Sequence, residues 1–353
     1  MADLFEALSD ADDAGLFYVT DTGPGIARRK RGTGFSYTGP DGALVDAETR
    51  EWIVSLAIPP AWTDVWICPL RDGHILATGR DAKGRKQYRY HERWREVRDG
   101  NKYFRLIDFA HALPALRKRV DEHLRVGGLP REKVLAAVVK LLDETNIRVG
   151  NDEYATMNES YGLTTMQEQH AVVEGSVIHF EFTGKSGVEA EIDLKDRRLA
   201  SIVKACQELP GEELFQYVGE DGAIVDVNSA HVNTFLRELT GGTFTAKDFR
   251  TWGGTVIAAE TLVELGPPAS EKDAEKQVLA AIDAAAEKLG NTRAVCRSCY
   301  VHPAIPEAHV DGTLHDAWRT SRGGATCRRG ERAVLRVLEQ HAAAAEQERK
   351  AAA

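Results

Sequence analysis

The stretch Glu132-Lys-Val-Leu-Ala-Ala-Val-Val-Lys-Leu-Leu-Asp-Glu-Thr-Asn-Ile147 decides the fold of the larger part of this chain. Its apolar residues recur at three- and four-residue spacing, for example at Val134, Val138 and Leu142, which is the pattern of a helix with one buried face. Gly150 interrupts the pattern shortly afterwards. The sequence therefore predicts a helical core that is built outward from this segment.

Helical spacing recurs on both sides of this stretch. A different pattern lies between the helices, because Val177–Phe182 and Val188–Leu194 flank Thr183-Gly-Lys-Ser-Gly187, which is typical of a β-hairpin with Lys185 at its tip. The predicted helices are Phe109–Arg125, Leu199–Glu208, Ser229–Leu239, Ala246–Glu264, Ser270–Leu289 and an alanine-rich helix from Arg332.

The first hundred residues have short apolar runs separated by turn residues, which favours strands. Asp46 is placed to cap a helix through Leu56, and Arg98-Asp-Gly-Asn-Lys102 is the predicted linker. We therefore expect an α+β protein of two lobes, a mainly β domain at 1–95 and a mainly α-helical domain at 96–353. The predicted strands are Leu16–Val19, a hairpin within Phe35–Val45, Asp64–Pro69, His74–Thr78 and Gln87–Tyr90.

The charge of the chain is unevenly distributed. The net charge of −9 argues against a nucleic-acid ligand, but Arg71–Arg105 holds eleven basic and five acidic residues and is therefore net positive by six. Aromatic residues are interleaved with these cations, as in many nucleic-acid-binding segments. Arg28-Arg-Lys-Arg31 is a second basic cluster. A phosphate-binding face needs local charge rather than a basic average, although a solvated surface is the alternative for both segments.

Composition also bears on where in the cell the protein is expected and on whether it is expected to bind a metal. No run of 18 apolar residues is present and the N-terminus is acidic, so we expect a cytoplasmic, nucleoid-associated protein with no membrane segment. Five cysteines make a disulfide framework unexpected. Cys296-x-x-Cys299 with nearby histidines invites a zinc interpretation, but a second ligand pair of the usual form is missing, so we predict no metal.

Five segments carry a family resemblance. In this order and spacing they resemble the poxvirus-like type IB DNA topoisomerases of bacteria, and the resemblance runs from about Leu16 to Tyr300. The segments are Gly84-Arg-Lys-Gln-Tyr88, Arg148-Val-Gly-Asn151, Gly184-Lys185, Lys247-Asp-Phe-Arg250-Thr-Trp-Gly253, and Leu289-Gly-Asn-Thr292 ahead of Tyr300.

The resemblance implies a role for each residue of the set. Tyr300 would be the nucleophile, Arg148 and Arg250 would clamp the scissile phosphate, and Lys185 would be the general acid. Asn291 would make a further phosphate contact. At this position the viral pattern has histidine, and an asparagine donates a hydrogen bond but is never a cation.

The chemistry of phosphodiester cleavage asks for these residue types independently. Guanidinium groups neutralise the nonbridging oxygens that repel a nucleophile. The leaving 5′-oxygen is a strong base that needs a proton, which a lysine supplies. A tyrosine forms a 3′-phosphotyrosine that conserves the bond energy for religation, so no ATP, metal or other cofactor is expected.

The resemblance also implies that double-stranded DNA is the partner, held by a monomer that clamps round the duplex. Asn151 can cap a short helix, and if Arg148, Asn151 and Tyr154 are helical, their spacing places them along one side. The predicted DNA contacts are Lys83, Arg85, Lys86, Gln87, Tyr88, Tyr90, Asn151 and Tyr154.

Alternatives remain at this stage. Taken singly, Arg148 could be a helix-end cation, Lys185 an ordinary hairpin lysine and Tyr300 a core residue. A tyrosine recombinase uses similar chemistry, but typically has His-x-x-Arg where this chain has Lys247-x-x-Arg250. A non-catalytic DNA-binding or chromatin protein is the second alternative, and the complete set of catalytic residue types argues against it.

Overall fold

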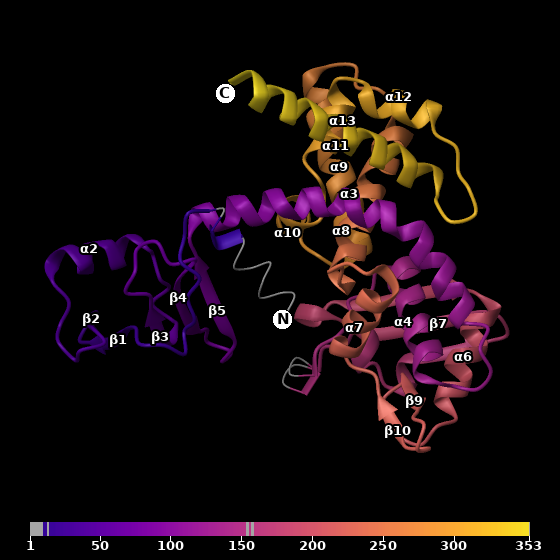
Figure 1. The fold of residues 1–353 in the computed structure, drawn as a ribbon, viewed down its shortest axis with the longest axis horizontal. Coiled ribbons are helices and arrows are strands. Elements are labelled where there is room, and N and C mark those ends of the chain that lie inside the picture. The colour runs from indigo at the N-terminus through magenta and orange to yellow at the C-terminus, as the bar shows by residue number, and fades with distance from the viewer. Residues whose placement is uncertain (1–9, 13, 153–154, 157–158, 353) are drawn as a thin grey trace. The chain divides into compact units, whose positions relative to one another are not determined.

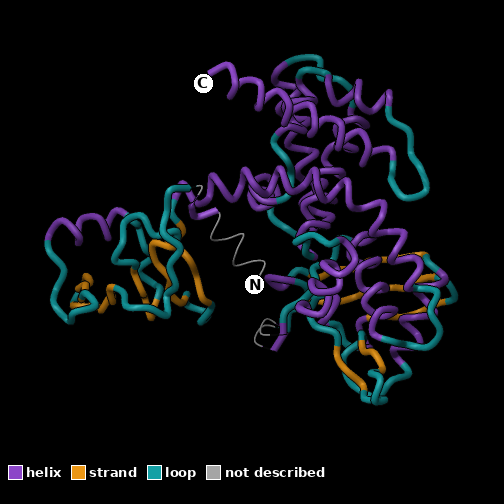
Figure 2. Tube along the Cα trace, in the orientation of Figure 1, coloured by secondary structure: helices purple, strands orange, loops and turns teal. Residues whose placement is uncertain are grey.

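Two compact units make up the chain. The computed structural model describes residues 10–12, 14–152, 155–156 and 159–352, and the chain divides into Met1–Tyr103 and Phe104–Ala353 (Figure 1). The first unit holds a β-sheet and the second is mainly helical, which confirms the predicted α+β class (Figure 2).

The division between the units falls inside a helix. Helix α3 (Glu92–His123) contains both the predicted boundary at residue 95 and the observed division at Tyr103. The linker predicted at Arg98–Lys102 therefore lies directly before the observed division, and its backbone is helical. A glycine inside a helix costs only about 1 kcal/mol, so Gly100 alone does not end the helix.

The first unit is built on one antiparallel sheet. Its strand order is β2-β1-β3-β4-β5, so β5 is an edge strand. Asp46 accepts a hydrogen bond from the Thr49 amide and caps α2 as predicted. The elements are β1 (Ile26–Arg31), β2 (Gly34–Thr38), α2 (Ala47–Ser55), β3 (Thr63–Ile67), β4 (Ile75–Arg80) and β5 (Lys86–Tyr90).

One strand prediction in this unit was wrong. Leu16–Val19 is not a strand, because Phe17 makes a single bridge to Gly73. The hairpin predicted within Phe35–Val45 is present in short form: the Gly39 amide donates to the Ala43 carbonyl at 2.8 Å, and Thr38 is bridged to Leu44, while β2 pairs along its length with β1. Strand β1 was not predicted, because it includes the basic cluster and only its first residue, Ile26, is buried.

The second unit combines helices with two small sheets. The strands are β6 (Ala171–Glu174), β7 (Val177–Thr183) and β8 (Glu189–Lys195) in one sheet, and β9 (Gln216–Val218) and β10 (Ile224–Asp226) in the other. The β7–β8 hairpin and the long helices agree with the predictions. The helices are α4 (Arg131–Thr145), α6 (Arg197–Gln207), α7 (Ser229–Thr240), α8 (Ala246–Leu265), α9 (Glu271–Leu289), α10 (Arg293–Cys299), α11 (Ala304–Val310), α12 (Thr313–Thr320) and α13 (Arg329–Ala352).

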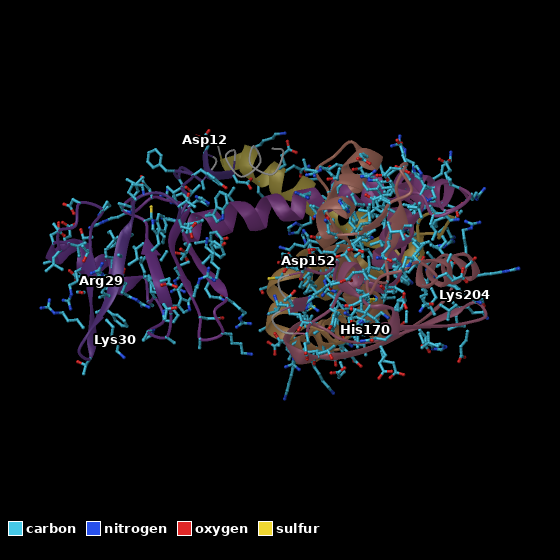
Figure 3. All side chains as sticks on the ribbon, turned by 90° about the horizontal axis from the view of Figure 1, so that it is seen from below. Asp12, Arg29, Lys30, Asp152, His170 and Lys204 are labelled. Carbon is cyan, nitrogen blue, oxygen red and sulfur yellow. The ribbon has the colours of Figure 1, made fainter. Side chains whose placement is uncertain are left out.

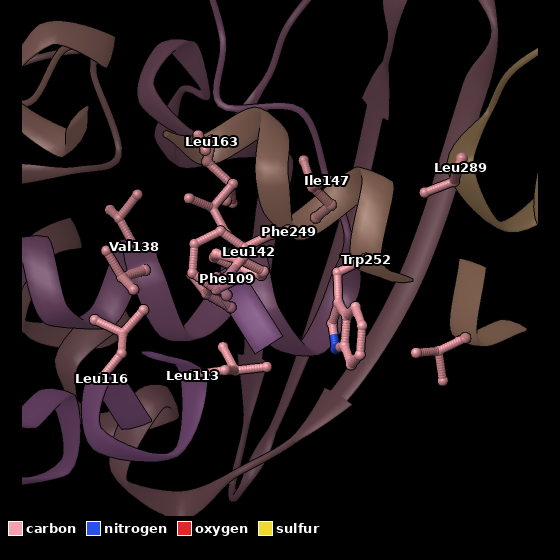
Figure 4. Close-up of a cluster of buried hydrophobic side chains, with 14 of the residues drawn as sticks. Phe109, Leu113, Leu116, Val138, Leu142, Ile147, Leu163, Phe249, Trp252 and Leu289 are labelled. Carbon is pink, nitrogen blue, oxygen red and sulfur yellow. The ribbon is translucent and has the colours of Figure 1, made fainter. Parts of the chain in front are cut away.

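One hydrophobic core fixes the helices that carry the candidate site (Figure 4). Phe109 of α3 packs edge-on against Phe249 of α8, with ring centroids 5.0 Å apart. Leu142 of α4 and Leu289 at the end of α9 are also buried in this core. Because Phe249 is buried here, the next residue, Arg250, is held at a defined position.

A buried ion network joins three helices of the same unit. Arg117 of α3 donates to Asp143 of α4 at 2.7 Å and to Glu331 of α13 at 2.6 Å. The Glu331 side chain is only 3% exposed. The network therefore ties the last helix to the core. Across the described residues, no helix is long and apolar enough to span a bilayer.

Candidate active site

The structure brings the five predicted catalytic positions together within the second unit. One hollow is lined by Arg148, Lys185, Arg250 and Tyr300. A neighbouring hollow is lined by Arg148, Lys185 and Tyr300 together with Asn291. The residues come from five separate segments, so the fold rather than sequence proximity assembles the site.

Arg148 is positioned by the end of α4. Asn146 stops that helix in the left-handed region with φ 58°, and the chain then continues without regular structure. The Arg148 carbonyl accepts from the Leu163 amide at 2.9 Å. Its side chain donates from Nη2 to the Gly290 carbonyl at 3.1 Å and to Asn291 Oδ1 at 2.5 Å.

Arg250 lies in the second turn of α8 and is 4% exposed. One of its Nη atoms donates to the Asn146 carbonyl and the other to the Leu289 carbonyl, the latter at 2.7 Å. Its guanidinium carbon lies 5.2 Å from the centre of the Tyr300 ring. Within the described part of the chain, its buried Nε has no hydrogen-bond partner.

Neither of these two arginines has a carboxylate hydrogen-bond partner among the described residues. Their hydrogen bonds run to carbonyl and amide oxygens, and Arg250 also bonds the Tyr300 side chain. Burial, followed by the nearby charge of Arg250, lowers the pKa of Arg148 to about 10. Burial likewise lowers the pKa of Arg250, with Tyr300 acting in the opposite direction. An anion bound between the two guanidinium groups would relieve this unfavourable electrostatic energy.

A glycine pair in α8 permits two close approaches. A Cβ atom on Gly253 would lie 2.0 Å from Asn146 Oδ1, whose backbone carbonyl holds Arg250. A Cβ atom on Gly254 would lie 2.9 Å from the Tyr300 carbonyl oxygen. Both separations are shorter than real Cβ contacts, so alanine at Gly253 would displace the Asn146 side chain and alanine at Gly254 would press on the Tyr300 backbone.

Asn291 follows the glycine that ends α9. Gly290 has φ 56°, and the Asn291 amide donates back to the Ala286 carbonyl at 2.9 Å, which is a glycine-dependent helix ending. The Asn291 Oδ1 accepts from Arg148, which leaves Nδ2 as the free side of the amide. Nδ2 is buried and has no partner among the residues described. Nδ2 is therefore available to donate a hydrogen bond to a bound ligand.

Lys185 and Tyr300 complete the group. Lys185 is exposed at the start of the 3₁₀ turn Lys185–Gly187 between β7 and β8. Tyr300 is half-buried and directly follows α10, with its amide donating to the Cys296 carbonyl at 2.9 Å. Tyr161 and Lys247 also line the first hollow and were not predicted. Lys247 begins the Lys247-x-x-Arg250 motif, which is the signal that could have found it.

A short helix begins directly after Asn151, as predicted, because Asp152 is helical and the Ala155 amide donates to the Asn151 carbonyl at 3.1 Å. Residues 146–151 are not helical, so Arg148 does not share one helix side with Asn151. Asn151 is exposed and lines the hollow with Arg148. Tyr154 lies outside the described residues.

The predicted DNA contacts of the first unit lie on β5 and the turn before it. Asp81 accepts from the Arg85 side chain at 2.8 Å and from Gln87 at 3.0 Å, and Asp21 pairs with Lys86 at 2.6 Å. Bonding to Arg85 is the main reason that the pKa of Asp81 is lowered. A phosphate would therefore compete with these carboxylates for the same cations.

The remaining predicted contacts of this unit are two tyrosines and a lysine. Tyr88 and Tyr90 lie two residues apart on β5, with stacked rings whose centroids are 5.7 Å apart. The Lys86 ammonium lies 5.4 Å from the Tyr88 ring centre. Lys83 is exposed in the preceding turn. Cation, aromatic rings and edge strand together form a surface suited to a nucleic acid.

In the second basic cluster, Arg28 bonds to the backbone of its own unit, whereas the other cations are exposed. Arg28 donates to the carbonyls of Ile58, Pro59 and Trp62, at 2.7 Å in the last case. Arg29 and Lys30 are exposed on β1 (Figure 3). Arg28 is therefore a structural residue, and the other cations of the cluster are free to meet solvent or a ligand.

The cysteines and histidines near Tyr300 make contacts that do not involve a metal. His309 contacts Gln277 at 2.7 Å and His315 at 3.2 Å. Cys296 is fully buried, and burial raises its pKa to about 11. Among the described residues, no three His, Cys, Asp or Glu side chains are grouped to hold a metal ion.

Comparison with known proteins agrees with the site. Residues 91–309 match the family model of the eukaryotic DNA topoisomerase I catalytic core. DNA topoisomerase 1B of Acanthamoeba polyphaga mimivirus is 34% identical over 285 residues, covering 78% of this chain and 85% of the viral protein. DNA topoisomerase 1B of vaccinia virus (strain Copenhagen) is 21% identical over 249 residues, covering 69% of this chain and 74% of that protein.

The chain therefore belongs to the type IB DNA topoisomerase family and has type IB DNA topoisomerase activity, with DNA as its substrate. Its first unit narrows this assignment further. Residues 34–81 match the N-terminal domain of bacterial DNA topoisomerase IB. The family resemblance found in the sequence is confirmed, and it decides against the tyrosine recombinase and the non-catalytic DNA-binding protein.

Proposed function

We propose that this topoisomerase relaxes supercoiled DNA by attack of the Tyr300 hydroxyl on one phosphodiester. The bond between the tyrosine oxygen and phosphorus forms as the bond from phosphorus to the 5′-oxygen breaks, which gives a 3′-phosphotyrosyl adduct. The phenol proton passes to water, and Lys185 protonates the leaving oxygen. After strand rotation the 5′-hydroxyl attacks the adduct, releases Tyr300 and reseals the strand.

The observation that carries this proposal is the pair of guanidinium groups beside Tyr300 that have no carboxylate hydrogen-bond partner among the described residues. Arg148 and Arg250 would hold the nonbridging oxygens of the phosphate and gain strength as charge develops in the transition state. Asn291 Nδ2, which has no partner in the described residues, would donate to the same group. Because the adduct conserves the energy of the phosphodiester, neither ATP nor a cofactor is needed.

The DNA would be held by both units. The proposed contacts are Lys83, Arg85, Lys86, Gln87, Tyr88 and Tyr90 in the first unit and Asn151 and Tyr154 in the second. We further propose that the working form is a monomer that clamps round the duplex, and that it acts on the nucleoid in the cytoplasm.

A plasmid assay tests the proposed chemistry. Negatively supercoiled plasmid should be relaxed in the presence of EDTA and without ATP, and detergent should trap a covalent adduct. Tyr300→Phe should bind DNA as the wild type does and lose both relaxation and adduct, because no other nucleophile is proposed. Tyr217→Phe, on β9, is the matched control and should behave like the wild type. An adduct that persists in Tyr300→Phe would move the nucleophile to another residue, with Tyr154 and Tyr161 the first to test.

A further inference from the structure

One buried hydroxyl contacts the backbone at the Tyr300 carbonyl and at the His302 amide that follows it. Thr255 of α8 is 0% exposed. Its Oγ1 accepts from the His302 amide at 3.2 Å. Its single proton faces two carbonyl oxygens, that of Tyr300 at 3.1 Å and that of Thr251 in its own helix at 2.8 Å, and is shared between them.

The chain around Tyr300 has little regular structure of its own to hold it. Helix α10 has only seven residues, and Tyr300 follows it with φ −129° and ψ −15°, outside the helical region. The Tyr300 and Val301 amides both donate to the Cys296 carbonyl. The next helix, α11, begins at Ala304. The contact with α8 is therefore what places this connecting segment against a long, well-packed element.

The neighbouring glycine provides an independent sign of close contact. A Cβ atom on Gly254 would lie 2.9 Å from the Tyr300 carbonyl oxygen, 3.2 Å from Tyr300 Cβ and 2.9 Å from Leu289 Cδ1. Backbone atoms cannot move aside as the end of a flexible side chain does. Gly254 and Thr255 together form a seat for Tyr300 on the helix that also carries Arg250.

We propose that Thr255 is a positioning residue for DNA cleavage, acting through the backbone of Tyr300. The inference rests on the proposed function, in which Tyr300 is the nucleophile. Arg250 and Thr255 are five residues apart on α8, so one rigid helix would fix both the phosphate-binding guanidinium and the attacking tyrosine. In-line attack depends on this relative placement, and a misplacement of about 1 Å costs roughly 10²-fold in rate.

Single-turnover cleavage of a duplex oligonucleotide tests the proposal. Thr255→Val removes the hydroxyl at nearly constant volume and should lower the cleavage rate constant by roughly 10- to 100-fold. DNA affinity, measured in the Tyr300→Phe background, should stay unchanged. Thr255→Ser keeps the hydroxyl and should stay within a few-fold of the wild type. Thr261→Val is the matched control, because the Thr261 hydroxyl donates within α8 to the Ile257 carbonyl.

A sulfur substrate separates positioning from proton donation. When the scissile 5′-oxygen is replaced by sulfur, the leaving group departs without a proton, so a defect in the general acid is rescued. The Thr255→Val defect should persist on that substrate, because it lies on the side of the nucleophile. Gly254→Ala should show the same slow cleavage with normal DNA affinity, and it keeps the test open if Thr255→Val does not fold.

Several results would overturn the proposal. The first is a wild-type cleavage rate constant in folded Thr255→Val, or a loss confined to its DNA affinity or to the fraction of active molecules. The second is an equal loss of cleavage rate in Thr261→Val. The third is rescue of the Thr255→Val cleavage rate by the sulfur substrate. A covalent adduct formed by Tyr300→Phe would instead overturn the proposed nucleophile. The two failures are therefore distinguishable.

Discussion

At the scale of single residues, the proposed chemistry depends on Arg148 and Arg250, whose hydrogen bonds within the described ranges do not run to carboxylates. The lowered pKa of Arg148, about 10, has burial as its main cause and the charge of Arg250 as the next. Arg148 stays protonated at neutral pH, so the unfavourable energy remains in the free protein until an anion binds. Asn291 adds a neutral donor beside the pair, where a histidine would add a further cation.

Lys185 provides the most direct test of the mechanism. A 5′-alkoxide departs slowly unless a proton arrives with it, so Lys185→Ala should lose several orders of magnitude in cleavage rate. The loss should largely vanish when sulfur replaces the scissile 5′-oxygen. Single-turnover rates on the two substrates provide the measurement, with Lys204→Ala on α6 as the control. An equal loss on both substrates would mean that Lys185 only holds the phosphate, and Arg148 would become the next candidate acid.

At the scale of secondary-structure elements, α8 and β5 have separate tasks. Helix α8 presents Arg250 from its second turn and receives Asn146 and Tyr300 at its glycine pair. Strand β5 is an edge strand; its Lys86 pairs with Asp21, and Arg85 in the turn before it pairs with Asp81. Because these ion pairs are on the surface, each contributes little to stability, and the cations stay available to phosphate.

The salt dependence of DNA binding tests the role of β5. Each cation that meets a phosphate releases counterions, so affinity falls steeply with salt. Replacing Arg85 and Lys86 together by alanine should reduce the slope of log affinity against log salt by about one to two units. Binding titrations at several salt concentrations would measure this, with Lys204→Ala as the control. An unchanged slope would place both residues away from the DNA.

The sequence was a good guide to elements with a strong hydrophobic period and a poor guide to the others. Helices α6 to α9 follow that period closely. Strand β1 does not, because after Ile26 its residues are largely exposed and basic. The five candidate catalytic positions were predicted from motifs in a fixed order, and in the structure they line two neighbouring hollows. Gly253, Gly254 and Thr255 could not be assigned in this way, because they act on backbone that the sequence does not show to be adjacent.

At the scale of the whole molecule, the ion network of Arg117, Asp143 and Glu331 joins the last helix of the second unit to its core. Burial alone would raise the pKa of Glu331, but its bonds to Arg117 lower it overall. A carboxyl whose folded pKa is depressed stabilises the fold above its unfolded pKa, and this contribution is lost as the pH falls through the folded value. The network should therefore weaken in acid.

Replacing Glu331 measures what the network contributes. Glu331→Ala leaves Arg117 without one buried partner and should cost about 3–5 kcal/mol of unfolding free energy at neutral pH. The difference from the wild type should shrink as the pH falls below about 4.5, near the unfolded pKa of a glutamate. Glu346→Ala breaks the exposed pair with Lys350 on the same helix and should cost about 0–1 kcal/mol. Urea unfolding over a pH series would measure both losses of unfolding free energy. Equal losses for Glu331→Ala and Glu346→Ala would contradict the stabilising role of the network.

The five residues proposed for catalysis all lie in the unit Phe104–Ala353, whereas six of the eight proposed DNA contacts lie in Met1–Tyr103. On these proposed assignments, substitutions in the first unit should change DNA binding more than the reaction chemistry. Exchanging that unit between relatives is accordingly a rational way to engineer binding preference without redesigning the active site.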